Sequence, residues 1–181
     1  MRDMIRLAKE LDYRLVLEDV HEGWLMPEEL AEAKVSVVLT PRGRRRATPG
    51  REDRSGSSIE TSAKLEKAGV PFAVATQMNT VSLDGVYGGR DLTGLALEAA
   101  FAVRGGCSEK AALAALTIVP ARVLGLDKRV GSIEAGKDAD LLILNGPPLD
   151  YRTYVEVALV GGKAVYDRDK DRVYPTFQRK P

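Results

Sequence analysis

The sequence predicts an α/β fold in which short parallel strands alternate with helices. Three apolar, β-prone runs lie at 13–17, 35–39 and 70–75, and a segment that is predicted to be helical precedes each one. The alternation of helices with buried-type strands is typical of a parallel sheet. A chain of 181 residues is long enough to bury a core around such a sheet.

The helices of this first half are predicted from apolar spacing and from their end residues. Residues 2–12 form an amphipathic pattern, and residues 27–34 begin with a proline and acids, which suit the first turn of a helix. The segment 58–68 is predicted to be helical, with Ser58 as its cap and Gly69 as its end.

The second half of the chain continues with shorter elements. Helical spacing over 92–103 is closed by two glycines, and Ser108 suits the cap of the Ala/Leu-rich run that follows. Pro120 and Gly125 suit the first turn and the end of another short helix. Residues 130–133 are predicted to begin an extended segment.

The C-terminal part is predicted to be antiparallel. Residues 139–144 are apolar and β-prone, and Gly146-Pro147-Pro148 ends that strand. The dipeptide Gly161-Gly162 lies between β-prone runs at 155–160 and 163–166, which is a strong signal for a two-residue hairpin.

An ordered set of residues between 108 and 169 resembles the C-terminal end of the amidohydrolase superfamily, in particular its imidazolonepropionase-like members. In that pattern a helix pair is followed by a GSIExGKDADL stretch and a hairpin. The matching residues here are Thr117, Pro120, Ala121, Leu124, Gly125, Leu126, Gly131 to Glu134, Gly136 to Leu141, Pro148, Leu149, Gly161, Gly162, Val165 and Tyr166. Val119 departs from the pattern, in which asparagine is usual. The family has no catalytic residue in this stretch, so it identifies a family and not a reaction.

The resemblance implies the C-terminal half of a (β/α)8 TIM-type barrel plus a small β-sandwich portion formed by the C-terminal strands. Residues 1–128 would be the partial barrel, with the three predicted strands as barrel strands six, seven and eight. Residues 129–181 would be the sandwich strands and a tail. A closed eight-stranded barrel alone takes about 250 residues, so we expect this chain to be the second half of such a protein.

Composition limits the other classes of function. Apolar residues make up 44% of the chain, charged residues 29%, and the net charge is +1. This balance gives no global attraction to nucleic acid or to anionic membranes. No apolar run approaches the roughly 20 residues of a membrane span, and the N-terminus has no signal-peptide pattern. The single cysteine, Cys107, fits a reducing compartment, and we expect a cytoplasmic protein.

The resemblance also implies a chemistry, the metal-dependent hydrolysis of carbon–nitrogen bonds in a small-molecule substrate. A divalent metal such as zinc lowers the pKa of a bound water and polarises the carbonyl, and a carboxylate takes the proton. In the family the ligands come from barrel strands one, four, five, six and eight. The ligands of strands one to five have no counterpart in this chain.

Asp19 and His21 are the candidate metal ligands. They follow the first predicted strand, where the family has the strand-six histidine, and residues two apart on a strand share a face. A carboxylate and an imidazole are both ligands for divalent metals. The alternative is that Asp19, His21 and Glu22 are solvated loop residues, because zinc sites usually have three or four ligands.

Gln77 occupies the position of the aspartate that the family has after strand eight. A neutral amide cannot accept a proton from a metal-bound water. An alignment shifted toward Asp84 would restore a carboxylate, although Asp84 lies well into the loop. The catalytic base is therefore unknown from the sequence.

The segment from Pro41 to Ser58 is predicted to be a mobile loop, because it is rich in Arg, Gly, Pro and Ser and nearly lacks apolar residues. Its arginines, concentrated at Arg42–Arg46, suggest a nucleic-acid patch, but no aromatic residues interleave them and Glu52 and Asp53 share the loop. A solvated loop and a site for an acidic substrate or partner are the remaining interpretations.

Three hypotheses follow for the protein. The first is a metal-dependent hydrolase that needs an N-terminal half or a partner chain, in a homo- or hetero-oligomer, because three parallel strands leave open edges. The second is a non-catalytic remnant or structural subunit. The third is a binder of anionic partners through the arginine loop.

Overall fold

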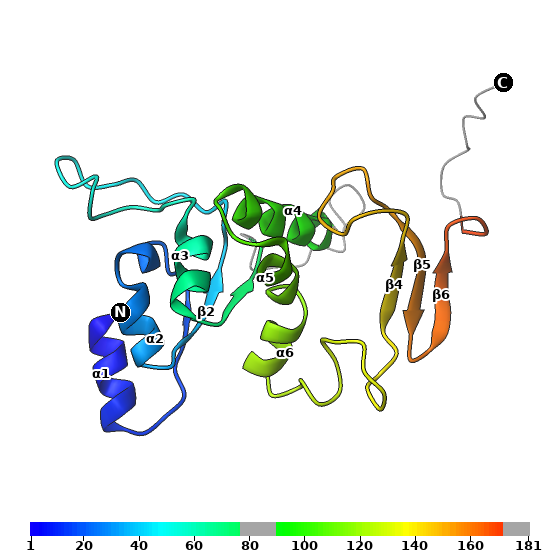
Figure 1. The fold of residues 1–181 in the computed structure, drawn as a ribbon, viewed down its shortest axis with the longest axis horizontal. Coiled ribbons are helices and arrows are strands. Elements are labelled where there is room, and N and C mark those ends of the chain that lie inside the picture. The colour runs from blue at the N-terminus through cyan, green and yellow to red at the C-terminus, as the bar shows by residue number, and fades with distance from the viewer. Residues whose placement is uncertain (77–89, 172–181) are drawn as a thin grey trace.

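The structure is a computed structural model that describes residues 1–76 and 90–171. Its first sheet consists of β1 (Val16–Glu18), β2 (Ser36–Leu39) and β3 (Phe72–Val74), which are parallel and adjacent in that order (Figure 1). Val16 pairs with Ser36, and Val37 pairs with Phe72. The predicted alternation of parallel strands and helices is confirmed.

Helices pack on this sheet through a compact apolar core. They are α1 (Arg2–Glu10), the short 3-10 helix η1 (Gly23–Leu25), α2 (Pro27–Glu32) and α3 (Thr61–Ala68). Leu30 of α2 and Leu65 of α3 are fully buried in one cluster with Val37 and Leu39 of β2. Burial of such side chains contributes about 1.5–3 kcal/mol each. Val38, which points to the opposite face of β2, is half-buried, so the two faces of the sheet are unequally covered.

The start of α3 corrects one prediction. Its N-cap is Glu60 and not Ser58, and no side chain caps the helix there. The Ser58 hydroxyl instead accepts a hydrogen bond from the Glu60 N–H, so a turn precedes the helix. The predicted C-terminus is confirmed, because Gly69 adopts the left-handed conformation with φ 74°.

Three further helices connect the two sheets, namely α4 (Arg90–Arg104), α5 (Glu109–Ala114) and α6 (Ile118–Val123). Ser108 caps α5 as predicted, since its hydroxyl accepts a hydrogen bond from the Ala111 N–H at 3.1 Å. The Val74 N–H of β3 donates to the Ala115 carbonyl at 3.0 Å, which fixes the end of α5 on the last parallel strand.

The second sheet is antiparallel and consists of β4 (Leu141–Leu144), β5 (Val155–Val160) and β6 (Lys163–Asp167). Gly161 and Gly162 form the predicted hairpin turn with φ 55° and 76°. Figure 1 shows this sheet at the end of the molecule opposite α1. The prediction of an extended segment that begins at residue 130 is wrong, because the backbone bends at 130–132 and the strand begins at Leu141.

The architecture fits a partial TIM-barrel-type α/β fold with an appended antiparallel sheet. Among the described strands, β1 and β3 each have a neighbour on one side only. The closed barrel, the β-sandwich and the division at residues 128 and 129 stay predictions. No described helix is both long enough and apolar enough to cross a bilayer.

Candidate functional site

The candidate site lies where the parallel strands end. Residues 19–21 follow β1, residues 40–43 follow β2, and residues 75–76 follow β3. In barrels and open sheets of parallel strands, catalytic and binding residues come from this carboxyl edge. Gln77 falls outside the described residues, so its predicted place at the end of β3 stays a prediction.

Asp19 and His21 come together in a tight turn and not on a strand. β1 ends at Glu18, Asp19 has a φ of 55°, and the His21 N–H donates to the Asp19 carbonyl at 2.7 Å. The expectation that the two residues share a strand face is therefore wrong. Both nevertheless line one small cavity of about 20 Å³, together with Thr40 and hydroxyl residues at the start of α3. This volume is about that of one water molecule.

The described residues alone fall short of a metal centre. Across 1–76 and 90–171, no group of three or more His, Cys, Asp or Glu side chains lies close enough to hold an ion. Asp19 and His21 are two donors, whereas zinc sites usually have three or four ligands. Further ligands would have to join them, so their role as metal ligands stays a prediction.

The loops after β1 and β2 touch at a glycine. A Cβ atom on Gly43 would lie 2.9 Å from the Thr40 carbonyl oxygen and 3.1 Å from Cε1 of His21. The first contact is with backbone, which cannot move away cheaply. A side chain at position 43 would therefore displace the His21 imidazole or distort the turn between Thr40 and Gly43.

A buried carboxylate, which the sequence analysis did not identify, fixes the base of the loop after β2. Glu98 of α4 is fully buried and accepts two hydrogen bonds from Arg42, from the backbone N–H at 2.9 Å and from Nε at 2.7 Å. The Arg42 guanidinium also lies 5.8 Å from the centre of the Phe101 ring. The sequence signal was Glu98 within the apolar face of a helix, next to Ala99 and near Ala102.

A second set of contacts holds the far end of the same loop. Glu22 accepts a hydrogen bond from the Gly56 N–H at 3.0 Å, and the Trp24 indole N–H donates to the Gly56 carbonyl at 2.9 Å. The Lys64 ammonium lies 4.9 Å from the Trp24 ring centre. Glu22 is thus a structural residue of the loop and not a solvated one.

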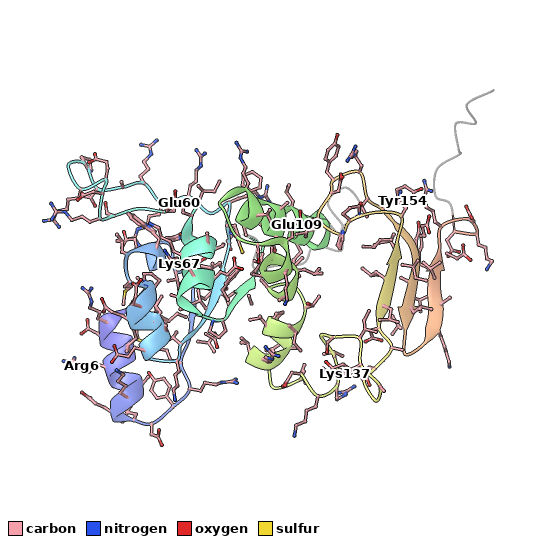
Figure 2. All side chains as sticks on the ribbon, viewed as in Figure 1. Arg6, Glu60, Lys67, Glu109, Lys137 and Tyr154 are labelled. Carbon is pink, nitrogen blue, oxygen red and sulfur yellow. The ribbon has the colours of Figure 1, made fainter. Side chains whose placement is uncertain are left out.

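The arginine-rich segment 41–58 has no helix or strand, as predicted, and its two sides are joined by hydrogen bonds. Ser57 and Arg45 bond through their backbones at 3.1 Å, and the Thr48 N–H donates to the Ser55 hydroxyl at 2.7 Å. We call this segment the arginine arm. Figure 2 shows it extending beyond Glu60 at the start of α3.

Cys107 is a buried packing residue. Its thiol is buried, and burial together with a hydrogen bond and the negative charge of Glu66 raises its pKa to about 12. A thiol with this pKa is not ionised at neutral pH and is a poor nucleophile.

Comparisons with known proteins identify the family. The sequence profile described as the amidohydrolase family matches residues 7–174. An imidazolonepropionase from Syntrophobacter fumaroxidans is 36% identical over 127 residues, which are 65% of this chain and 24% of that protein.

Solved structures extend the likeness to the fold. The crystal structure of an amidohydrolase from Thermotoga maritima superposes with a TM-score of 0.74 and 36% identity, and the match covers 91% of this chain and 40% of that one. An adenosine deaminase from Xanthomonas campestris, solved with bound zinc, shares the fold at 24% identity and a TM-score of 0.56. The chain thus spans less than half the length of these relatives.

Proposed function

Because the chain belongs to the amidohydrolase family, we propose that it forms the C-terminal part of a metal-dependent hydrolase that cleaves carbon–nitrogen bonds other than peptide bonds. The observation that carries the proposal is the family match over nearly the whole chain, combined with loops that meet at the carboxyl edge of the parallel sheet. A small molecule is the expected substrate.

The proposal includes a second component that completes the barrel. Within the described residues, the free edge of β1 has unpaired backbone groups, and one face of β2 is incompletely covered. Exposed strand edges of this kind readily pair with another strand. The missing part would be an N-terminal amidohydrolase segment, either in the same polypeptide or in a partner chain. We expect this assembly in the cytoplasm.

Asp19 and His21 would then lie beside the metal. When bound, the metal would provide an activated water and a polarised carbonyl. The two side chains would add a carboxylate and an imidazole at the mouth of the barrel, held by the turn after β1 and by the close packing of Gly43. The residue that accepts the proton would come from the second component, since Gln77 offers no carboxylate.

A non-catalytic subunit is the second candidate function, and the small number of potential metal ligands favours it. Across the described residues no group of three or more potential ligands could hold a metal ion, and the sequence has glutamine where the family has its aspartate. Such a chain would complete the fold of a partner without taking part in the reaction.

Complementation separates these two candidates. The chain is mixed with the separately expressed N-terminal part of the Thermotoga maritima amidohydrolase, and hydrolysis of cyclic and N-acyl amides is followed with zinc present. We expect no turnover by either part alone and turnover by the mixture. The His21→Ala variant should reduce this turnover while leaving association unchanged. Association without turnover supports the structural subunit instead.

A further inference from the structure

The arginine arm forms a groove beside the strand ends, and we propose that this groove binds an oxyanion group, a phosphate or a carboxylate, of a small-molecule ligand. The groove has a volume of about 570 Å³ and lies between the arm and α4. Its lining includes Arg42, Arg44, Arg45, Arg46 and Phe101. The claim that the anion is part of the substrate rests on the proposed function. The claim that the groove binds an anion does not.

Three of the lining cations have no partner among the described residues. Arg44, Arg45 and Arg46 are exposed, and within the described part of the chain their guanidinium groups form no hydrogen bond or ion pair. Arg42 differs, because its guanidinium forms an ion pair with Glu98 at 2.7 Å. The unpaired charges are therefore concentrated on one wall, although the whole chain has a net charge of only +1.

The acids of the arm do not compensate these charges. Asp53 lies 3.6 Å from Arg54, and the Glu52 carboxylate accepts a hydrogen bond from the Gly50 N–H. Neither acid lines the groove. The positive wall is thus open to an external anion, for which arginine is well suited because its planar fork binds two oxygens at once.

Both ends of the arm are anchored, which reduces the entropy lost when a ligand binds. Glu98 holds Arg42 at the start, and Glu22 and Trp24 hold Gly56 near the end. Between these anchors the Arg45 N–H donates to the Ser57 hydroxyl at 3.0 Å. The arginine side chains therefore project from a backbone that is held at both ends, and Gly43 of the same arm packs next to His21.

The ligand is a small oxyanion and not a polyanion, because the cluster is short and isolated. No aromatic residue lies within the arm for bases to stack on, and Phe101 already contacts the Arg42 guanidinium. The position next to the carboxyl ends of the strands would place the anionic group of a substrate beside the reacting centre.

The test measures binding to the full chain by calorimetry, with inorganic phosphate and acetate as probes. The groove variant R44Q/R45Q/R46Q is compared with a control, R6Q/R51Q/R54Q, which also removes three exposed arginine charges but none from the groove. Exposed charge pairs each contribute little, but three are removed together, so the groove variant should lose about threefold or more in affinity. The control should stay within about twofold of the parent chain. Circular dichroism of both variants verifies the fold.

The outcomes are distinct. Tighter binding of phosphate identifies a phosphorylated ligand, and tighter binding of acetate identifies a carboxylate; both support the groove. Absence of binding by the parent chain, or equal losses in the two variants, overturns it. Tight binding of a single-stranded oligonucleotide that is equally sensitive to both variants also overturns it, since it indicates general polyanion attraction. Failure of complementation without loss of phosphate binding would refute the hydrolase and not the groove.

Discussion

Removal of the Glu98 carboxylate should destabilise the protein strongly, because two hydrogen bonds end on a fully buried group. Glu98→Ala leaves the Arg42 N–H and Nε without the acceptor that lies 2.9 and 2.7 Å away. Removing one partner of a buried ion pair costs about 3–5 kcal/mol. The Arg42 side chain is 39% exposed, so water recovers part of this loss, and we expect a decrease in unfolding free energy of about 2–3 kcal/mol.

Two further variants separate the contributions of the two hydrogen bonds to the free energy of unfolding. Glu98→Gln retains the shape and one carbonyl oxygen, so it should cost about 1–2 kcal/mol. In the Arg42→Ala background the backbone N–H of residue 42 still points at Glu98, so Glu98→Ala should remain destabilising there, by about half as much.

The assay is urea unfolding, in which the m-values of parent and variant should agree, combined with amide hydrogen exchange of the loop after β2. Exchange at Gly43 should accelerate in Glu98→Ala. If that variant loses less than about 0.5 kcal/mol and the loop remains protected, the buried pair does not hold the loop and the reasoning fails.

Three other predictions follow from single contacts. Gly105→Ala should cost about 2–3 kcal/mol in urea unfolding, since its Cβ would lie 2.0 Å from the Ile59 carbonyl oxygen, whereas Gly94→Ala should stay within about 1 kcal/mol of the parent. The Cys107 thiol, with its pKa raised to about 12, should react with iodoacetamide at pH 8 only after denaturation; rapid reaction of the folded chain would contradict this. Hydrogen bonds from the cap of α5 lower the pKa of Glu66, so its stabilisation is present above the unfolded pKa and lost as pH falls. Glu66→Gln should therefore flatten the acid decline of Tm, and an unchanged decline would refute the assignment.

Local features of the fold were the most predictable from sequence. Gly161-Gly162 identified the hairpin because both positions need positive φ, and Ser108 identified a helix start because its hydroxyl caps a free N–H. Where several local partners compete, prediction was less accurate. Ser58 binds the Glu60 N–H in a turn, and α3 therefore begins later than expected.

The site was less predictable because its contacts join residues distant in sequence. Asp19 and His21 were proposed as ligands from their place after a strand, which stays a prediction, and the turn that ends β1 early was not foreseen. Glu98 and Arg42 are hydrogen-bonded but lie 56 positions apart in the sequence, and no local pattern predicts that they pair. A glutamate on an apolar helix face still marks such a group, because a buried carboxylate needs a partner.

The zinc content of the purified chain after dialysis tests the central claim most directly. Two donors at the end of β1 are too few for a stable zinc site, so the chain alone should retain far less than one zinc per molecule. After complementation with an N-terminal amidohydrolase segment, the complex should retain stoichiometric zinc. A stoichiometric ion held by the chain alone would contradict the account.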